Sequence, residues 1–339
     1  MDVFVCGGCG AGLTAPLTRV PLPAQAAQCF GHVLLPPLMG PGTYAVDPAP
    51  SGPPWRTWEE LGEAEAAARG VFAPVYSVSL GAPGRIVVAP GDSRGTVLIQ
   101  ERCESHCMGL DGGAGPNLAC EECGLPVATR VDDYGLWQAV WFEPDAVRRT
   151  RVTGAAPTVP AEATSPVDPS GCWSPLWEAA AGTALAHLLV ASAGGPVALP
   201  DGYLGEMFGR AVATLLPSGP GARSVGLAGP GVPAMGVDIA LVPPHPLTGE
   251  PWQPDGGAVP VPLEASVWAY LALPGEISPV PVSGTLPEGV LRDDYPLPLR
   301  PRGLFRPDRH VFRHTLARLP EVRLPWLRAI HDRAWDPWR

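Results

Sequence analysis

The motif Cys-x-x-Cys-Gly occurs twice in this chain, as CGGCG at residues 6–10 and as CEECG at residues 120–124. Two thiolates three positions apart can bind one side of a metal ion. The glycine that follows the second cysteine lets the backbone turn tightly around the ion. The chain therefore contains two metal-binding turns, and its fold has to supply further ligands to each of them.

One grouping of ligands lies within a single stretch of the chain, Cys103-x3-Cys107-x12-Cys120-x2-Cys123. Its spacing is that of a zinc ribbon, in which four thiolates surround one ion. The intervening segment, residues 108–119, contains four Gly and one Pro, so it can return the chain to the ion without helix or strand constraints. We predict a structural zinc on these four cysteines.

A second set, with three thiolates and one imidazole, consists of Cys6, Cys9, Cys29 and His32. An alternative arrangement pairs the two Cys-x-x-Cys-Gly turns with each other and leaves a partial site or bystanders at Cys103, Cys107 and His106. The spacing alone does not decide between these arrangements. In each of them the soft thiolates favour Zn over harder ions.

A catalytic zinc usually has three protein ligands and an open position for water. Sets of four ligands leave no such position, so we expect the zinc to be structural and its loss to unfold the N-terminal domain. The remaining enzymatic hypothesis is a pocket where carboxylates converge. Its candidate residues are Asp111, Asp132, Asp133, Asp201 and Asp238.

The eight cysteines are not read as disulfides, because Met1 leads into a Cys-Gly stretch without a basic start or an apolar run. We therefore expect no secretory signal and a cytoplasmic protein, where thiols stay reduced. Residues 179–200 contain no Asp, Glu or Arg, but they are mostly Ala, Gly and Ser and include His187. They predict a buried helix and no membrane span, because Ala and Gly drive membrane insertion only weakly.

All 23 basic residues are Arg, and the chain has no Lys. A GC-rich bacterial coding sequence would produce this composition. The absence of Lys excludes Schiff-base chemistry on lysine, pyridoxal-phosphate anchoring and the phosphate-binding loop that ends in Gly-Lys-Ser/Thr.

The net charge of −10 is unevenly distributed, because residues 300–339 contain ten Arg and only four acidic residues. The acidic remainder disfavours general nucleic-acid binding, although the zinc turns together with this Arg- and Trp-rich segment keep it as an alternative. We expect the segment from residue 324 to form an amphipathic helix whose Arg side chains pair with acids of the body. The same region is our candidate surface for a protein partner.

The predicted fold class is α+β and loop-rich, since 41 Gly and 45 Pro make up about a quarter of the chain. We expect a zinc-ribbon-like, strand-rich domain at residues 1–150 and a linker rich in Pro, Ala and Thr at residues 151–171. A mixed α/β domain follows at residues 172–339. Together these expectations describe a zinc-stabilised binding or assembly protein.

In the first domain, residues 85–90, 96–100 and 136–142 read as strands, and residues 55–70 read as a helix that stops at Gly70. The intervening GDSRG (91–95) matches the nucleophile pattern of serine hydrolases. However, a strand follows it where that motif requires a helix, so we expect a hairpin turn and no nucleophile at Ser93.

In the second domain we expect helices at residues 174–193, 200–217 and 307–319, with Ser174 and Asp308 as N-caps. His310 and His314 are four residues apart, a spacing that allows two imidazoles to share one ion. Arg309 and Arg313 would repel a cation there, so we expect this helix face to pack against the protein instead. Cys172 is expected to be a small buried hydrophobic residue.

Overall fold

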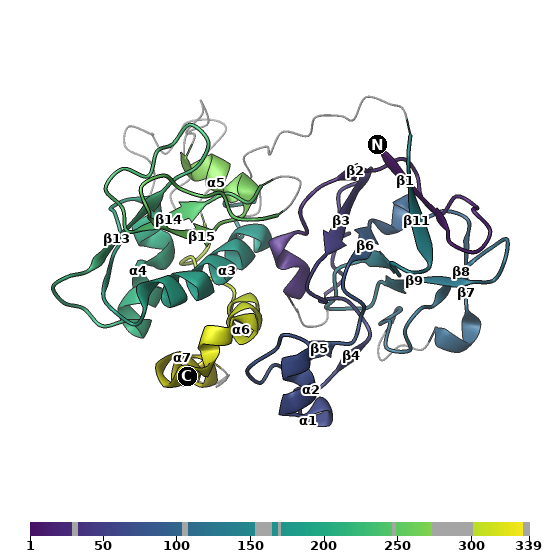
Figure 1. Ribbon diagram of the computed structural model, residues 1–339, viewed down its shortest axis with the longest axis horizontal. Coiled ribbons are helices and arrows are strands. Elements are labelled where there is room, and N and C mark those ends of the chain that lie inside the picture. Colours follow the sequence, from purple (N-terminus) through teal and green to yellow (C-terminus); the bar gives the residue numbers. More distant parts are fainter. Residues whose placement is uncertain are drawn as a thin grey trace. The chain divides into compact units, whose positions relative to one another are not determined.

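The computed structural model describes residues 1–28, 33–103, 108–152, 165–168, 171–245, 249–272 and 301–334 (Figure 1). The chain divides into two compact units, Met1–Thr158 and Val159–Arg339. Both helices and sheets are present, as the predicted α+β class requires. Most of the predicted linker, residues 151–171, lies outside the described residues, so its linker character stays a prediction.

Unit 1 contains a seven-stranded sheet with the order β2-β3-β6-β10-β9-β8-β7. All of its neighbouring strands are antiparallel except the short pair β2 and β3. The strands are β2 (Thr18–Arg19), β3 (Thr43–Asp47), β6 (Arg85–Val88), β7 (Thr96–Leu98), β8 (Leu118–Cys120), β9 (Pro126–Val131) and β10 (Ala139–Phe142).

Two smaller sheets complete unit 1. In one, β1 (Asp2–Cys6) pairs with β11 (Val147–Arg151), and in the other, β4 (Trp55–Arg56) pairs with β5 (Val78–Ser79). Residues 11–17 run back antiparallel to β1, with bridges from Val5 to Gly12 and from Asp2 to Leu17. Residues 2–17 therefore form a hairpin with the first Cys-x-x-Cys-Gly turn at its tip.

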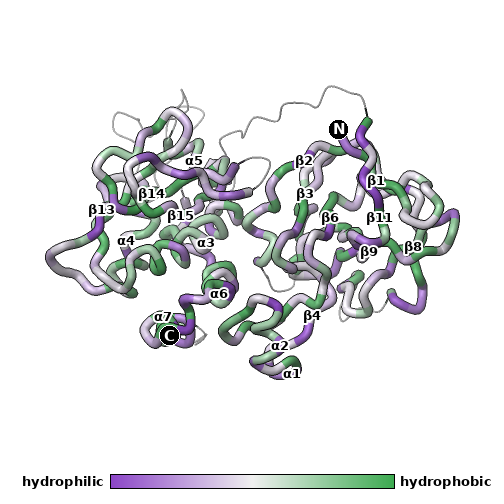
Figure 2. The backbone as a smooth tube through the Cα atoms, viewed as in Figure 1, coloured by the Kyte–Doolittle hydropathy of each residue, from purple (hydrophilic) through white to green (hydrophobic). Residues whose placement is uncertain are grey.

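The central strands of the large sheet are buried on both faces. On β6, Ile86 and Val88 belong to one core cluster, together with Phe4 and Tyr44, whereas Val87 faces a second cluster that contains Trp141. Burial of both faces explains why RIVVAP reads as a continuous apolar run without alternation. In Figure 2, by contrast, the hydrophilic colour of the edge strand β11 reflects its three arginines.

The strands predicted at residues 85–90, 96–100 and 136–142 are present as β6, β7 and β10, but the predicted hairpin between the first two is wrong. β6 pairs with β3 and β10, whereas β7 lies at the far edge of the sheet beside β8. GDSRG therefore begins a crossover between distant strands. Ser93 follows a short 3-10 turn (η2, Pro90–Asp92), and its hydroxyl lies 3.3 Å from that of Thr96.

The helix predicted at residues 55–70 is divided into α1 (Trp58–Leu61) and α2 (Glu63–Ala68). Gly62 separates them because its φ of +75° lies outside the helical region. The Thr57 hydroxyl and the Glu60 carboxylate cap α1 reciprocally. Two further 3-10 turns in unit 1 are η1 (Ala24–Ala27) and η3 (Gln100–Arg102).

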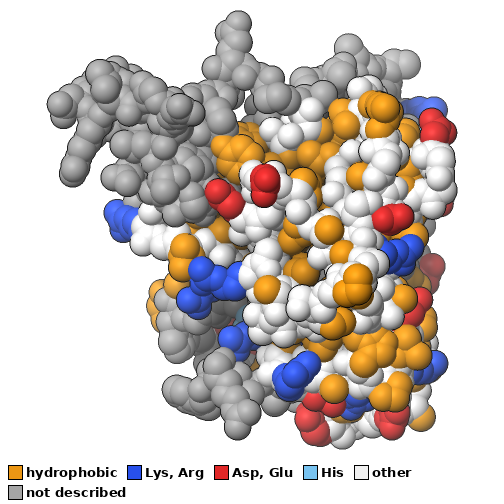
Figure 3. Space-filling view, turned by 90° about the vertical axis from the view of Figure 1, so that its left-hand side faces the viewer, with side chains coloured by type: hydrophobic (Ala, Val, Ile, Leu, Met, Phe, Trp, Pro, Cys, Tyr) orange, Lys and Arg blue, Asp and Glu red, His pale blue; other side chains and the backbone are white. Residues whose placement is uncertain are grey.

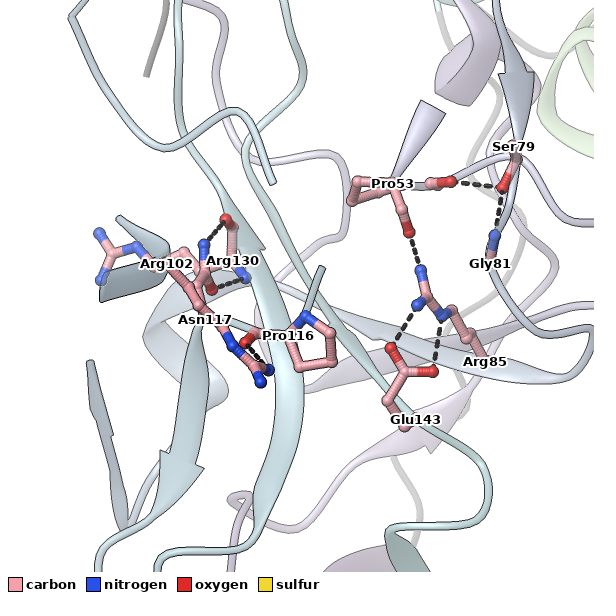
Figure 4. Close-up of polar contacts among 10 residues, drawn as sticks. Pro53, Ser79, Gly81, Arg85, Arg102, Pro116, Asn117, Arg130 and Glu143 are labelled. Atoms are coloured by element: carbon pink, nitrogen blue, oxygen red, sulfur yellow. Dashed lines mark hydrogen bonds and ion pairs between the residues drawn. The ribbon is translucent and has the colours of Figure 1, made fainter. Parts of the chain in front are cut away.

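The side chains of Asn117 and Arg85 tie together separate segments of unit 1 (Figure 4). The side chain of Asn117, the one asparagine in the chain, exchanges two hydrogen bonds with the backbone of Arg130 and so extends the pairing of β8 with β9. The buried Arg85 guanidinium forms a two-pronged ion pair with Glu143 and donates to the Pro53 carbonyl. A buried arginine is stable only with such partners.

Unit 2 contains a four-stranded parallel sheet with the order β12-β13-β14-β15. Its strands are β12 (Val197–Ala198), β13 (Arg223–Leu227), β14 (Ile239–Val242) and β15 (Val259–Pro262). The helix α4 (Tyr203–Leu215) connects β12 to β13, and irregular segments make the other two crossovers. The helix α5 (Ala265–Ala272) follows β15.

The helix α3 (Pro175–Ser192) matches the predicted one and is buried on most of its surface. It packs against β14, β15 and the helix α6 (Arg309–Arg318). Gly182 allows the close approach of α6, since a Cβ there would lie 2.6 Å from the Asp308 carbonyl oxygen. Among the described residues, no helix is long and apolar enough to cross a membrane.

The chain ends in α6, the 3-10 turn η4 (Pro320–Arg323) and α7 (Pro325–Arg333). Asp308 caps α6 as predicted, with its carboxylate accepting from the Val311 N–H at 2.8 Å. The amphipathic α7 is also confirmed, with Leu327 and Ile330 buried. Arg328, however, pairs with Asp332 of the same helix at 2.9 Å, which corrects the expectation that α7 arginines pair with acids of the body.

Candidate metal centre

The two Cys-x-x-Cys-Gly turns have the same backbone hydrogen bonds. In each, the N–H of the glycine donates to the carbonyl of the first cysteine, from Gly10 to Cys6 at 3.0 Å and from Gly124 to Cys120 at 2.8 Å. Both glycines have positive φ, +82° and +73°, which a residue with a side chain rarely adopts. The motif therefore specifies the same local turn at two distant places in the sequence.

Each turn lies at the tip of a hairpin. The N–H of Cys6 donates to the Ala11 carbonyl and that of Cys120 donates to the Leu125 carbonyl, both at 2.8 Å. The first hairpin is β1 with residues 11–17, and the second is β8 with β9. Strand pairing thus holds each turn at the tip of its hairpin.

The two hairpin tips bring four sulfur atoms together, those of Cys6, Cys9, Cys120 and Cys123. All four lie within 4.8 Å of one another. The Sγ atoms of Cys6 and Cys123 are 3.6 Å apart, and so are those of Cys9 and Cys120. Sulfurs about 2.3 Å from a tetrahedral zinc lie about 3.8 Å from one another, so the cluster has the dimensions of a four-thiolate site.

The first cysteine of each turn is buried and the second is exposed. Cys6 and Cys120 belong to the same core cluster as Phe4 and Leu13, so the sulfur cluster forms the end of the hydrophobic core. The six described cysteines, those at positions 6, 9, 103, 120, 123 and 172, are all free of disulfides. The cluster therefore presents thiol groups that a metal ion can bind.

Backbone N–H groups point at the buried sulfurs. Burial by itself raises the pKa of the Cys6 thiol, but hydrogen bonds from the N–H groups of Cys9 and Gly8 and from neighbouring thiols lower it to about 7. Cys120 receives the equivalent bonds from Cys123 and Glu122, yet burial dominates and its pKa is raised. Such N–H groups stabilise a thiolate and reduce the repulsion among several of them.

The pKa of the Cys123 thiol is raised, unlike that of Cys6. The N–H of Leu125 lowers the pKa of this thiol, but the hydrogen bonds with Cys6 and the other cluster thiols, together with burial, raise it to about 12. Four thiolates this close repel one another, so they can lose all their protons only when a cation is present. Binding of a metal ion to this cluster would therefore release thiol protons.

The predicted ligands are only partly brought together. The structure forms the alternative pairing of the two Cys-x-x-Cys-Gly turns, which corrects the favoured grouping of Cys120 and Cys123 with Cys103. Cys103 is half-buried outside the cluster, and its Sγ lies 3.2 Å from the Ile99 carbonyl oxygen. The other predicted ligands, Cys107, Cys29 and His32, as well as His106, lie outside the described residues.

The carboxylates proposed for an enzymatic pocket do not converge among the described residues. Asp132 and Asp133 accept backbone N–H groups of Leu110 and Met108 and so hold the segment before β8 in place. In the same way, Asp111 accepts from Gly113, and Asp238 binds both the backbone and the hydroxyl of Ser224. Asp201 is exposed in the other unit.

Burial lowers the pKa of two histidines of unit 2, His314 and His187. Burial, with a smaller contribution from Arg318, lowers the pKa of His314 to about 3, whereas His310 on the same helix is exposed. The two imidazoles therefore have different surroundings. His187 on α3 has a pKa lowered by burial. Cys172 is exposed, contrary to its expected burial.

Comparisons of the chain with protein-family models, with curated proteins and with solved structures found no match. The interpretation of the cysteine cluster consequently rests on its geometry.

Proposed function

We propose that this chain is a zinc-stabilised binding or assembly protein of the cytoplasm and that its zinc is structural. The observation that carries the proposal is the cluster of Cys6, Cys9, Cys120 and Cys123, whose sulfurs lie within 4.8 Å of one another. Zinc is the metal we assign, because soft thiolates select it and its preferred tetrahedron fits these distances. A reducing compartment keeps such thiols available.

The structural role follows from the number of ligands. Four thiolates complete a tetrahedral shell and leave no position for water or substrate. Two turns at the tips of two hairpins are also the arrangement of a zinc ribbon, and we propose that unit 1 uses a zinc-ribbon-like centre in a larger sheet. The ion would join the hairpin of β1 to that of β8 and β9, which belong to different sheets.

A binding role is supported by the surface of unit 2. Leu304 and Leu324 in the C-terminal region are about half exposed (52% and 48%), and Arg323 and Arg328 flank the second of them. Figure 3 shows hydrophobic side chains interspersed with charged ones of both signs on one side of the molecule. Arginine is enriched at protein interfaces, so we assign a protein partner to this region.

The metal assignment is tested by measuring the zinc content of the full-length protein by native mass spectrometry. We expect at least one zinc per chain. The variant Cys9→Ser, which removes an exposed ligand without disturbing the core, should lose one zinc, and Cys103→Ser should keep it. A folded wild-type protein without zinc would overturn the proposal, as would loss of zinc from the Cys103 variant alone.

A further inference from the structure

A small cavity lies in unit 1 between the β1–β11 sheet and the face of the large sheet, and no cysteine lines it. Its volume is about 240 Å³. Five of its lining residues are apolar, namely Phe4, Val46, Ile86, Pro144 and Val147. Most of them also belong to or pack against the core cluster, so the walls of the cavity are fixed by the fold.

Two polar side chains complete the lining, Tyr44 and Arg149. Tyr44 is almost completely buried (1% exposed), and its hydroxyl donates to the Asp2 carboxylate at 2.7 Å. The Tyr44 ring also meets Phe4 edge to face, with centroids 5.0 Å apart. The tyrosine is therefore a rigid part of the wall, held from two sides.

Arg149 is the cation of the cavity. Its side chain is 53% exposed, and its nearest carboxylate oxygen, on Asp2, is 4.0 Å away, at the limit of an ion pair. The Tyr44 hydroxyl and the Asp2 carboxylate beside this guanidinium raise the pKa of Arg149. A guanidinium has five N–H donors in a planar fork, so these contacts leave donors for a ligand.

We propose that this cavity binds a small monocarboxylic acid with an apolar aliphatic or aromatic body. The planar guanidinium of Arg149 would hold the carboxylate with two parallel hydrogen bonds. The apolar body would lie against Val46 and Pro144, the apolar lining residues that are only partly buried.

The size and charge of the cavity define this class of ligand. Pockets for drug-sized molecules occupy roughly 300–1,000 Å³, so 240 Å³ suits a smaller molecule. A cationic ligand would be repelled by Arg149. A phosphate dianion would have one cation as partner and would lie close to the Asp2 carboxylate, whereas a single negative charge and an apolar body match the lining.

The alternation of β11 supplies a matched control. Val147 and Arg149 face the cavity, and Arg148 between them points to the other side of the strand. There its Nη2 lies 3.9 Å from the position that a Cβ at Gly10 would occupy. Arg148 and Arg149 thus carry the same charge on the same strand but face different surroundings.

The test is titration of the full-length zinc-loaded protein with benzoate and with 3-methylbutanoate, followed by protein-observed NMR. We expect dissociation constants of about 1 mM or tighter, given the binding energy available to ligands of this size. Arg149→Gln should weaken binding by about 10-fold or more, because a charge-assisted hydrogen bond is lost. Arg148→Gln should leave it within about 2-fold.

Two further measurements separate the carboxylate from the apolar part. Benzyl alcohol, which lacks the charge, should bind at least about 10-fold more weakly than benzoate. Val46→Phe, which fills the cavity without touching the arginine, should also abolish binding while the protein stays folded. The proposal is overturned if no binding is detected at a benzoate concentration 10-fold above the expected dissociation constant. It is equally overturned if inorganic phosphate binds as tightly, or if Arg148→Gln weakens binding as much as Arg149→Gln.

Discussion

Removing a buried thiolate of the cluster, with the substitution Cys120→Ser, should destabilise unit 1 strongly. The bound zinc would connect residues that are 111 positions apart, Cys9 and Cys120. A cross-link that closes a loop of about 100 residues stabilises a fold by about 4.7 kcal/mol in the chain-entropy description. Whole domains are stable by only about 5–15 kcal/mol, so this is a large fraction.

The expected change in melting temperature follows from that figure. For a domain of about 150 residues, each kcal/mol shifts the midpoint by roughly 2–4 °C, so Cys120→Ser should lower it by about 10–20 °C. Excess chelator should produce a similar shift in the wild type and almost none in the variant, since both treatments remove the same cross-link. Differential scanning calorimetry of the full-length protein measures both effects.

The matched control is Cys103→Ser, because Cys103 is close to the cluster in sequence and half-buried, but its thiol contacts the Ile99 carbonyl and not the cluster. Its loss should cost less than about 1 kcal/mol. Cys172→Ser, at an exposed position in the other unit, should leave the midpoint unchanged. The reasoning is refuted if Cys103→Ser is as destabilising as Cys120→Ser, or if chelator leaves the wild-type midpoint where it was.

Three predictions concern unit 2. Gly182→Ala should destabilise it by about 1–3 kcal/mol in urea denaturation, because the new Cβ would lie 2.6 Å from the Asp308 carbonyl oxygen. Gly209→Ala, at an open position of α4, should instead be neutral or stabilising by up to about 1 kcal/mol, and equal effects would contradict the close helix contact. Asp308→Ala should cost about 1 kcal/mol through loss of the α6 cap, whereas Asp308→Asn should retain most of it. Finally, stability should fall as the pH drops below about 6.5, because burial lowers the pKa of three histidines, to about 3 for His314. The unfolded chain then binds protons that the folded unit does not, and each such histidine contributes up to about 1.4 kcal/mol per pH unit. Glu178 acts in the opposite direction, because burial and Asp308 raise its pKa to about 7, so it offsets one of the three. A melting temperature of unit 2 that is constant between pH 7 and pH 5 would contradict this sum.

Local sequence signals predicted α3, α4, α6 and α7 of unit 2 but not α5. Asp308 caps α6, Ser174 occupies the N-cap position of α3 and Pro175 is its first residue, because the helix start is determined by groups within a few residues of it. The helix at residues 55–70 was only partly predicted, since the apolar pattern continues through Gly62 although its backbone does not. A glycine with positive φ has no distinct signal in a single sequence.

Strand pairing was less predictable. β6 and β7 are separated by a short turn-like segment, yet they lie four strands apart in the sheet order. Their pairing is decided by which apolar faces share a core, and Val88 meets the cluster of Phe4 and Tyr44. Such long-range contacts are not encoded in the local period of a strand.

The same distinction explains the outcome at the metal centre. Each Cys-x-x-Cys-Gly turn could be recognised, because its geometry depends on two cysteines and the glycine that follows them. The pairing of one turn with another depends on how the strands are arranged. The short sequence separation between Cys103 and Cys120 favoured these two as ligands of one ion. The hairpin of β1 overrides that preference, since strand pairing and core packing bring Cys6 and Cys9 to the tip of β8 and β9.

The cysteine cluster is also the point where the core and the metal centre merge. Cys6 and Cys120 lie in the same apolar cluster as Phe4, whereas Cys9 and Cys123 are exposed. Strand pairing holds each turn at a hairpin tip, so a bound metal ion would add a connection between two elements that the fold brings together. A preassembled site loses little chain entropy on binding and therefore converts more of the metal–thiolate energy into stability. That is the arrangement expected of an ion whose role is to hold two sheets of one unit together.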